Sequence, residues 1–172
     1  ENGQFAEHWD IIQPIDPKLP DAGFSCGRGL TYEAAKAAGN TVANPACGKP
    51  DQSADRAANR KLVLDYMRMG LTPGRLIEAL NTYLADDFVQ HSPNIPAGKQ
   101  GAIAYLSSLS KARAKDHRTS KFERVVADGD LVLVHRLVTS DSNPRGTVYV
   151  DLFRVKNGKI AEHWDVVQRT PE

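Results

Sequence analysis

The sequence predicts an α+β fold in which three helices cover one face of a curved antiparallel sheet. Apolar residues recur every three or four positions from residue 56 to about 115, and from residue 122 onward they alternate with polar residues. Helices that precede the strands, rather than alternating with them, favour helices grouped on one side of an antiparallel sheet. At 172 residues, the chain has room for one such domain and an appended segment.

Three helices are expected between residues 53 and 115. Ser53 opens the first, whose apolar positions follow a helical spacing as far as residue 67. Thr72 caps the second helix, with Pro73 at its first position and an apolar stripe that runs to Leu84. The third helix follows the Pro93–Gly98 segment, whose proline and glycine residues are typical of a loop.

Four strands follow, joined by short turns. They are expected over residues 122–127, 131–139, 146–155 and 160–168. The turn signals between them are Asp-Gly-Asp at 128–130, Ser-Asn-Pro at 142–144 and Asn-Gly at 157–158. Because such short turns join antiparallel neighbours, each strand is expected to pair with the next one along the chain.

An internal repeat links the two ends of the chain. Residues 2–13 read NGQFAEHWDIIQ and residues 157–168 read NGKIAEHWDVVQ, with eight identities in twelve positions. We interpret residues 1–13 as the terminal strand of an upstream, mostly absent repeat, and we expect this strand to be ordered, extended and docked on a sheet outside residues 55–172. The alternative is a strand duplicated within a single domain.

Residues 14–54 have the composition of a linker. They hold five of the ten prolines and five of the thirteen glycines, with one short helix expected over residues 31–38. Both cysteines, Cys26 and Cys47, lie here. A disulfide between them would favour a secreted or periplasmic location, and two free thiols would favour the cytoplasm. Two thiols without a nearby histidine pair do not predict a zinc site.

The charge and hydropathy exclude two classes of partner. With 22 Lys and Arg against 21 Asp and Glu, the formal net charge is +1, so bulk charge does not predict nucleic-acid binding. No apolar run approaches the roughly 18 residues of a membrane helix, so no membrane partner is expected. A small molecule is the expected partner instead.

The order of motifs resembles one protein family. Two helices, the segment FVQHSPNIPAGKQG, a third helix and strands ending in VDLFRVKNGKIAEHWDVVQ are similar to the SnoaL-like branch of the nuclear transport factor 2-like superfamily. The resemblance covers residues 55–172 and implies a conical barrel that encloses one apolar pocket and commonly dimerises through the outer sheet face. It also implies polyketide cyclase, isomerase or epoxide hydrolase chemistry without a cofactor, although the same fold hosts binding proteins.

The last hairpin gathers polar residues on one face if its turn has three residues. A loop over residues 156–158 would pair Val155 with Lys159 and place Asp151 opposite His163. Asp165 would then lie on the same face, whereas a two-residue loop would put Asp151 and Asp165 on opposite faces. Two carboxylates and an imidazole on a half-buried face are costly unless they are hydrogen-bonded or used.

The resemblance implies a role for Asp165. The family's cyclases use an aspartate in the final strand, which matches Asp165, together with a histidine fourteen residues earlier, where this chain has Asp151. That difference departs from the cyclase pattern and leaves Asp165 as a base for a proton next to a carbonyl, with Asp151 and His163 orienting it. The alternative is a buried polar network with only a structural role.

Other residues are expected around these three. The resemblance places His91, His135, Phe88, Tyr105 and Trp164 in the substrate pocket. The histidines beside the aspartates raise the alternative of a metal, but no HxxxH or CxxC spacing supports one, so no metal is predicted. No phosphate-binding glycine loop or GxSxG motif predicts covalent chemistry.

The expected function is therefore a cofactor-independent acid/base enzyme for a small, largely apolar molecule with a carbonyl group. Isomerisation, aldol-type cyclisation and hydration all fit this chemistry. The alternative is a small-molecule binding domain with the same pocket and no catalysis. A homodimer or the upstream repeat is expected to cover the apolar outer face, which carries Val150, Leu152, Trp164 and Val166.

Overall fold

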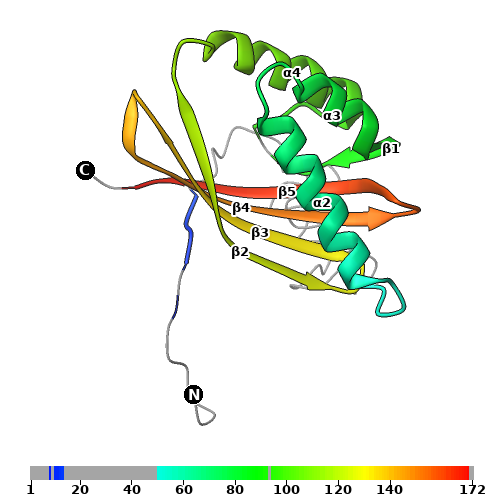
Figure 1. Cartoon of the computed structure of the whole chain (residues 1–172). Helices are drawn as coiled ribbons and strands as arrows, with labels where there is room; N and C mark the ends of the chain where they lie inside the picture. The colour runs from blue at the N-terminus through cyan, green and yellow to red at the C-terminus, as the bar shows by residue number, and fades with distance from the viewer. Residues whose placement is uncertain (1–7, 9, 14–49, 93, 171–172) are drawn as a thin grey trace, which may run out of the picture.

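The computed structural model describes residues 8, 10–13, 50–92 and 94–170, and it has three helices and five strands there (Figure 1). In chain order these elements are α2 (Arg56–Leu71), α3 (Leu76–Tyr83), β1 (Leu84–Gln90), α4 (Gly98–Ala112), β2 (Arg118–Asp128), β3 (Leu131–Ser140), β4 (Asn143–Lys156) and β5 (Lys159–Arg169). The α+β class and the four predicted strands are confirmed, and every predicted strand is longer than expected.

The sheet is mixed and open, with the strand order β1-β5-β4-β3-β2. The β2 to β5 strands form the expected antiparallel meander. The β1 strand pairs in parallel with β5, and the sequence pattern did not predict it. The prediction of a purely antiparallel sheet was wrong because the apolar stripe of the second helix appeared to continue through Leu84, whereas α3 ends at Tyr83.

Two helix boundaries differ from the predicted ones. Asp55, not Ser53, caps α2, because its carboxylate accepts the backbone N–H groups of Ala57 and Ala58. Thr72 ends α2 instead of opening α3, since its backbone N–H and its hydroxyl both donate to the carbonyl oxygen of Arg68. Side-chain oxygens can therefore satisfy either end of a helix, and the sequence pattern alone did not distinguish them.

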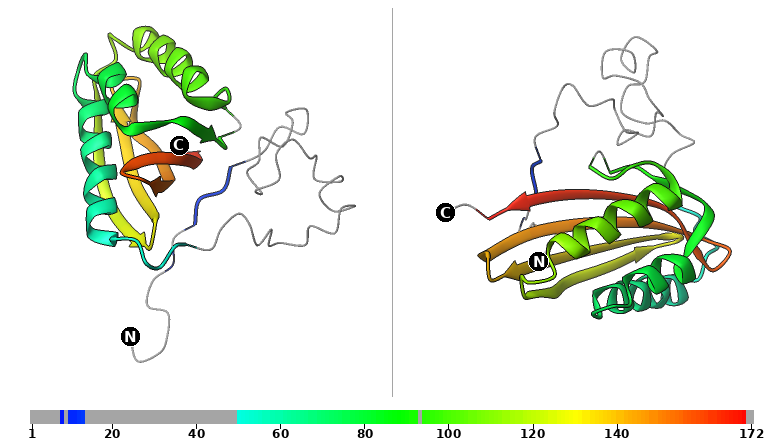
Figure 2. Two further views of the ribbon diagram at one scale, coloured as in Figure 1. Left: turned by 90° about the vertical axis from the view of Figure 1, so that its right-hand side faces the viewer. Right: turned by 90° about the horizontal axis from the view of Figure 1, so that it is seen from above.

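The helices lie on one face of the sheet, which we call the inner face (Figure 2). The core there joins side chains of α2 and α3 to those of the strands: Val63, Met67, Leu80, Val132, Val134, Phe153, Val155 and Ile160. The other, outer face carries half-buried apolar residues such as Leu133, Val150 and Leu152. The homodimer expected on this outer face stays a prediction.

A tight turn and a bulge set the register of the last hairpin. Asn157 (φ 52°) and Gly158 (φ 70°) form a two-residue turn, with Lys156 paired to Lys159. The register then shifts by one residue at Ala161, so that Asp151 pairs directly with Asp165. The predicted three-residue loop is wrong. The bulge nevertheless has the effect expected of that loop, since it places Asp151 and Asp165 on the same face of the hairpin.

Residues 10–13 lie beside the free end of β5. The backbone N–H of Ile12 donates to the side chain of Gln168 at 2.9 Å, and the N–H of Val167 donates to the side chain of Gln13 at 2.8 Å. These residues are not in a strand, and their partners lie within residues 55–172, so these hydrogen bonds contradict the expected docking on a sheet outside that range. The rest of the predicted N-terminal strand, the 31–38 helix and the two cysteines lie outside the described residues, so the upstream repeat and the disulfide stay predictions.

No helix in the described part of the chain is long and apolar enough to cross a membrane.

Candidate active site

Asp151, His163 and Asp165 lie together on the inner face, beneath the helices. The pairing of Asp151 with Asp165 and of Phe153 with His163 puts all three on the same side of β4 and β5. One donor atom from each lies within 4.8 Å of the other two. Their exposed fractions are 4%, 8% and 8%, so the three are buried. The structure therefore brings the three residues together as the hairpin argument expected.

Arg136 of β3 joins this cluster, and the sequence analysis missed it. It pairs with Tyr149 across the sheet, which places it on the inner face, and its Nε lies 2.7 Å from Asp151 Oδ2. Burial alone would raise the pKa of Asp151, but Arg136 and His163 outweigh it and lower this pKa to about 2. Asp151 is therefore charged at neutral pH. The signal in the sequence was a charged residue inside the apolar run of residues 131–138.

His163 has an oxygen acceptor on each side of its ring. Its Nε2 lies 3.3 Å from Asp151 Oδ1, and its Nδ1 lies 3.0 Å from Gln90 Oε1. That Gln90 oxygen also accepts the backbone N–H of Ser92, which fixes the amide so that it offers only an acceptor to the ring. The ring therefore lies between Asp151 and Gln90, and contacts on both sides fix its orientation.

Asp165 differs from its neighbours because one of its oxygens is unsatisfied. Asp165 Oδ1 is buried and has no hydrogen-bond partner within the described part of the chain. An unpaired buried oxygen costs on the order of 1–3 kcal/mol, so such a group is expected to have a use. This carboxylate oxygen keeps an unused capacity to accept a hydrogen bond or a proton, although Asp165 is not among the residues that line the cavity described below.

Tyr66 of α2 lies over the cluster. Its ring packs edge-on against Phe153 with centroids 5.8 Å apart, and Phe153 in turn stacks on His163 at 4.8 Å. Burial, together with the negative charge of Asp151, raises the pKa of Tyr66 above its ordinary value. Tyr66 therefore keeps its proton and offers a neutral hydroxyl near the carboxylates.

Three of the predicted pocket residues lie on the outer face instead. Trp164 pairs with Leu152 and therefore points away from the inner face, and His91 stacks on Trp164 at 4.3 Å. His135 pairs with Val150, which also faces outward. The expectation that they share a cavity with Asp165 was wrong, because adjacent residues of a strand point to opposite faces.

The remaining two predicted residues do not line the cavity described below. Phe88 of β1 is 4% exposed and packs in the core beneath the helices. Tyr105 is half-buried on α4. The position of Phe88 is explained by packing alone.

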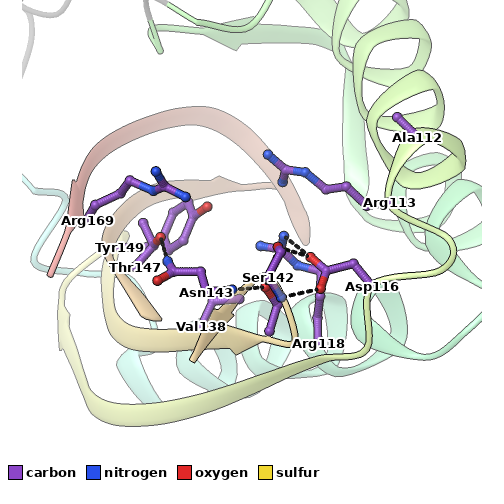
Figure 3. A pocket seen from close by; sticks show the side chains of 11 residues that line it. Ala112, Arg113, Asp116, Arg118, Val138, Ser142, Asn143, Thr147, Tyr149 and Arg169 are labelled. Atoms are coloured by element: carbon purple, nitrogen blue, oxygen red, sulfur yellow. Dashed lines mark hydrogen bonds and ion pairs between the residues drawn. The ribbon is translucent and has the colours of Figure 1, made fainter. Parts of the chain in front are cut away.

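A cavity of about 320 Å³ opens at the end of the sheet near the β3–β4 turn (Figure 3). Val138, Thr147, Tyr149 and Arg169 line it from the inner face, and the segment after α4 supplies further polar residues. An apolar pocket was expected, but most of this lining is polar. Tyr149 connects it to the buried cluster, since the Arg136 guanidinium lies 4.3 Å from the Tyr149 ring centre.

The cluster suits proton transfer better than a divalent cation. Asp151, His163 and Asp165 are possible metal donors by distance. However, Arg136 lies against Asp151 Oδ2, and both nitrogens of His163 face acceptor oxygens. A metal bound by His163 would have to break its contact with Asp151 or Gln90 and would lie near a guanidinium charge, which is electrostatically unfavourable.

Comparisons with known proteins agree on the fold. The model of the SnoaL-like domain family matches residues 63–163. A "putative polyketide cyclase" from Acidithiobacillus ferrooxidans is 19% identical with a TM-score of 0.51, over 65% of this chain and 89% of that chain. A "putative ketosteroid isomerase" from Kribbella flavida is 19% identical with a TM-score of 0.55, over 70% and 84%.

An LEH-like epoxide hydrolase from M. tuberculosis is 18% identical with a TM-score of 0.50, over 66% of this chain and 84% of that chain. A search of curated proteins finds no match. At these identities the solved structures establish the fold alone, while the family model spans more than half of the sequence. The chain therefore belongs to the SnoaL-like domain family.

Proposed function

We propose that this domain is a cofactor-independent acid/base enzyme in which Asp165 moves a proton next to the carbonyl group of a small molecule. The observation that carries the proposal is the unpartnered, buried Oδ1 of Asp165. A general base needs a free oxygen within reach of the substrate proton, and Asp165 supplies one on the inner face.

The charges around Asp165 support this role. Arg136 and His163 both lie against Asp151, so the carboxylate of Asp151 is paired while Asp165 Oδ1 is not. The low pKa of Asp151 and its ion pair keep it charged and occupied, so it does not compete for the substrate proton. Asp151 thus acts as a positioning residue for His163 and Arg136.

Tyr66 is the proposed donor to the oxygen of the substrate. Removing a proton beside a carbonyl moves negative charge onto the carbonyl oxygen, and a neutral hydroxyl stabilises that charge by donating a hydrogen bond. The raised pKa of Tyr66 keeps its proton in place for this purpose. In the reverse step, protonated Asp165 returns the proton to carbon.

The names of the structural neighbours agree with this chemistry. One neighbour is called a ketosteroid isomerase and another a polyketide cyclase, both with the word putative, and a third is an LEH-like epoxide hydrolase. Isomerisation and aldol-type cyclisation both begin by removing a proton next to a carbonyl. Hydration fits the same residues if Asp165 activates water.

Exchange of carbon-bound hydrogen for deuterium tests the proposal without knowledge of the product. The protein is incubated in D₂O with ketones that carry hydrogen next to the carbonyl, including 6-oxo-6-phenylhexanoate, its methyl ester and cyclohexanone, and exchange is followed by NMR. We expect the protein to accelerate exchange for at least one ketone, and Asp165→Asn to reduce the rate at least about 100-fold. Asp87→Asn, which alters an exposed aspartate of β1, is the matched control.

The proposal fails if no ketone exchanges faster with the protein, or if Asp165→Asn exchanges at the original rate. Ligand binding without exchange would instead assign the domain to the non-catalytic binders of this fold. Calorimetry with the same ketones measures binding directly. If Asp165→Asn still binds a ketone but no longer exchanges its hydrogen, the variant is folded and the loss concerns catalysis.

A further inference from the structure

The cavity at the end of the sheet has a strongly basic lining. Arg113, Arg118 and Arg169 all contribute to it, against a single acidic residue, Asp116. That aspartate is already engaged, since it accepts hydrogen bonds from the backbone N–H and the hydroxyl of Ser142 and lies 4.0 Å from Arg118. The lining therefore carries an excess of positive charge that its own acidic residue does not balance.

Two of these arginines approach the cavity from opposite walls. Arg113 follows α4 directly, and Arg169 ends β5. Figure 3 shows the two side chains extended toward each other across the cavity. Neither forms an ion pair within the described part of the chain, whereas most other arginines there do. Two like charges that face one cavity repel, and an anion between them would remove that repulsion.

The cavity has the size and the chemistry of an oxyanion site. Its volume of about 320 Å³ lies at the lower end of the range of small-molecule sites. Guanidinium groups bind carboxylate and phosphate oxygens through paired N–H donors. The Tyr149 hydroxyl lies in the same lining as an additional polar group.

The cavity and the buried carboxylates share the inner face of β4 and β5. Arg169 pairs with Thr147 at the cavity, and Asp165 pairs with Asp151 in the cluster. Arg169 lies four positions after Asp165 in the strand, which corresponds to about 13 Å between their Cα atoms. Because the arginine side chain covers part of this distance, a molecule of modest length reaches from one group to the other.

We propose that the substrate carries a carboxylate or phosphate group, which Arg113 and Arg169 bind at the open end of the fold while its carbonyl group reaches Asp165. This inference rests on the proposed function and adds the substrate class to it: small keto acids or phosphorylated ketones. The anionic group then anchors one end of the molecule, and the proton transfer occurs at the other.

Calorimetry with a matched acid and ester tests the anion site. The probes are 6-oxo-6-phenylhexanoate, its methyl ester and inorganic phosphate, all at low ionic strength. We expect the acid to bind at least about tenfold more tightly than the ester, because hydrogen bonds between charged groups are stronger than those to a neutral ester. Arg113→Gln and Arg169→Gln should each remove most of that advantage and leave the affinity for the ester unchanged.

Arg60→Gln is the matched control, since it removes one exposed positive charge of α2 far from the cavity in sequence. It should leave the affinity for the acid unchanged. Displacement of the acid by phosphate would assign the site to phosphorylated ketones, and binding of the acid without displacement would assign it to keto acids. Equal affinities for acid and ester, or full affinity in both arginine variants, would overturn the proposal.

The two proposals fail separately. If Asp165→Asn abolishes deuterium exchange while the arginine variants keep the affinity for the acid, the anion site is wrong and the proton transfer stands. If the arginine variants lose the acid while Asp165→Asn keeps the exchange rate, the anion site stands and the role of Asp165 is wrong.

Discussion

Each face of the β4–β5 hairpin carries a cluster of acidic side chains with arginine and histidine partners, but the two clusters differ in how completely the acidic groups are hydrogen-bonded. On the outer face, His91 Nε2 lies 2.9 Å from Glu162, Glu162 accepts from Arg154 at 2.8 Å, and Arg154 also reaches Asp130 at 2.6 Å. On the inner face, Arg136, Asp151 and His163 are linked in the same manner, but Asp165 Oδ1 is left without a partner.

This difference separates a structural cluster from a candidate functional one. The outer cluster ties the end of β1 to β5 and the β2–β3 turn to β4, and its acidic groups are satisfied by histidine or arginine. The hydrogen bond from His91, with Arg154 nearby, lowers the pKa of Glu162, as expected for a paired carboxylate. A satisfied network needs no ligand, while an unsatisfied buried oxygen such as Asp165 Oδ1 calls for an explanation, of which a catalytic role is one.

The largest expected effect on stability comes from the inner ion pair. Arg136→Met should lower the free energy of unfolding by about 3–5 kcal/mol, because it leaves the buried charge of Asp151 without its partner. Urea denaturation measures this change, with Arg60→Met as the exposed control. A loss below about 1 kcal/mol, the value of an exposed pair, would show that the inner cluster is open to solvent.

Acid should reveal the same pair through its pH dependence. The pKa of Asp151 falls from its ordinary value of 3.8 to about 2 in the folded protein, so its stabilisation is complete above pH 4 and is lost as the pH falls toward 2. The shift corresponds to about 2 kcal/mol. Unfolding curves between pH 5 and 2 should therefore converge for the wild type and Asp151→Asn. Parallel curves would contradict the ion pair.

A smaller effect is expected on the outer face. Glu162→Gln weakens two charge-assisted hydrogen bonds, to His91 and Arg154, in a side chain that is about a quarter exposed. We expect a loss of about 1 kcal/mol in the free energy of unfolding. The deuterium exchange rate should stay within about twofold of the original. A large loss of exchange would move the outer cluster into the catalytic machinery.

The smallest effect on stability is expected for Asp165→Asn. Since Asp165 Oδ1 has no partner to lose, the free energy of unfolding should change by less than about 0.5 kcal/mol. Thermal and urea unfolding of this variant, beside Glu162→Gln, compare the two faces directly. A loss larger than that of Glu162→Gln would mean that Asp165 is a structural residue, and the contrast between the faces would disappear.

Elements with a strong local pattern were predictable from the sequence. The helical spacing of residues 56–71 and the alternation of β3 to β5 arise from burial on one face, so they are visible in a short window. The β1 strand was not predictable, because its sequence LADDFVQ contains two exposed acids and its partner β5 lies some seventy residues away. Its parallel pairing depends on tertiary structure.

The candidate site was predictable only in part. The grouping of Asp151, His163 and Asp165 was expected from side-chain parity, although for the wrong turn. Arg136 could have been placed on the inner face by the same alternation of side chains along a strand, and it stands out in the sequence because it interrupts an apolar strand. The position of His91 could not, because a residue just after a strand takes its direction from the loop, and here the stacking on Trp164 fixes it.

The extra residue at Ala161 also determines how this chain must be aligned with its relatives. Without a gap at that position, an alignment to a hairpin that lacks the bulge would match each residue of β5 with one that faces the opposite way. Asp165 would then be compared with outward-facing residues, and its role would be missed. The repeat at residues 2–13 carries an alanine, Ala6, at the equivalent sequence position.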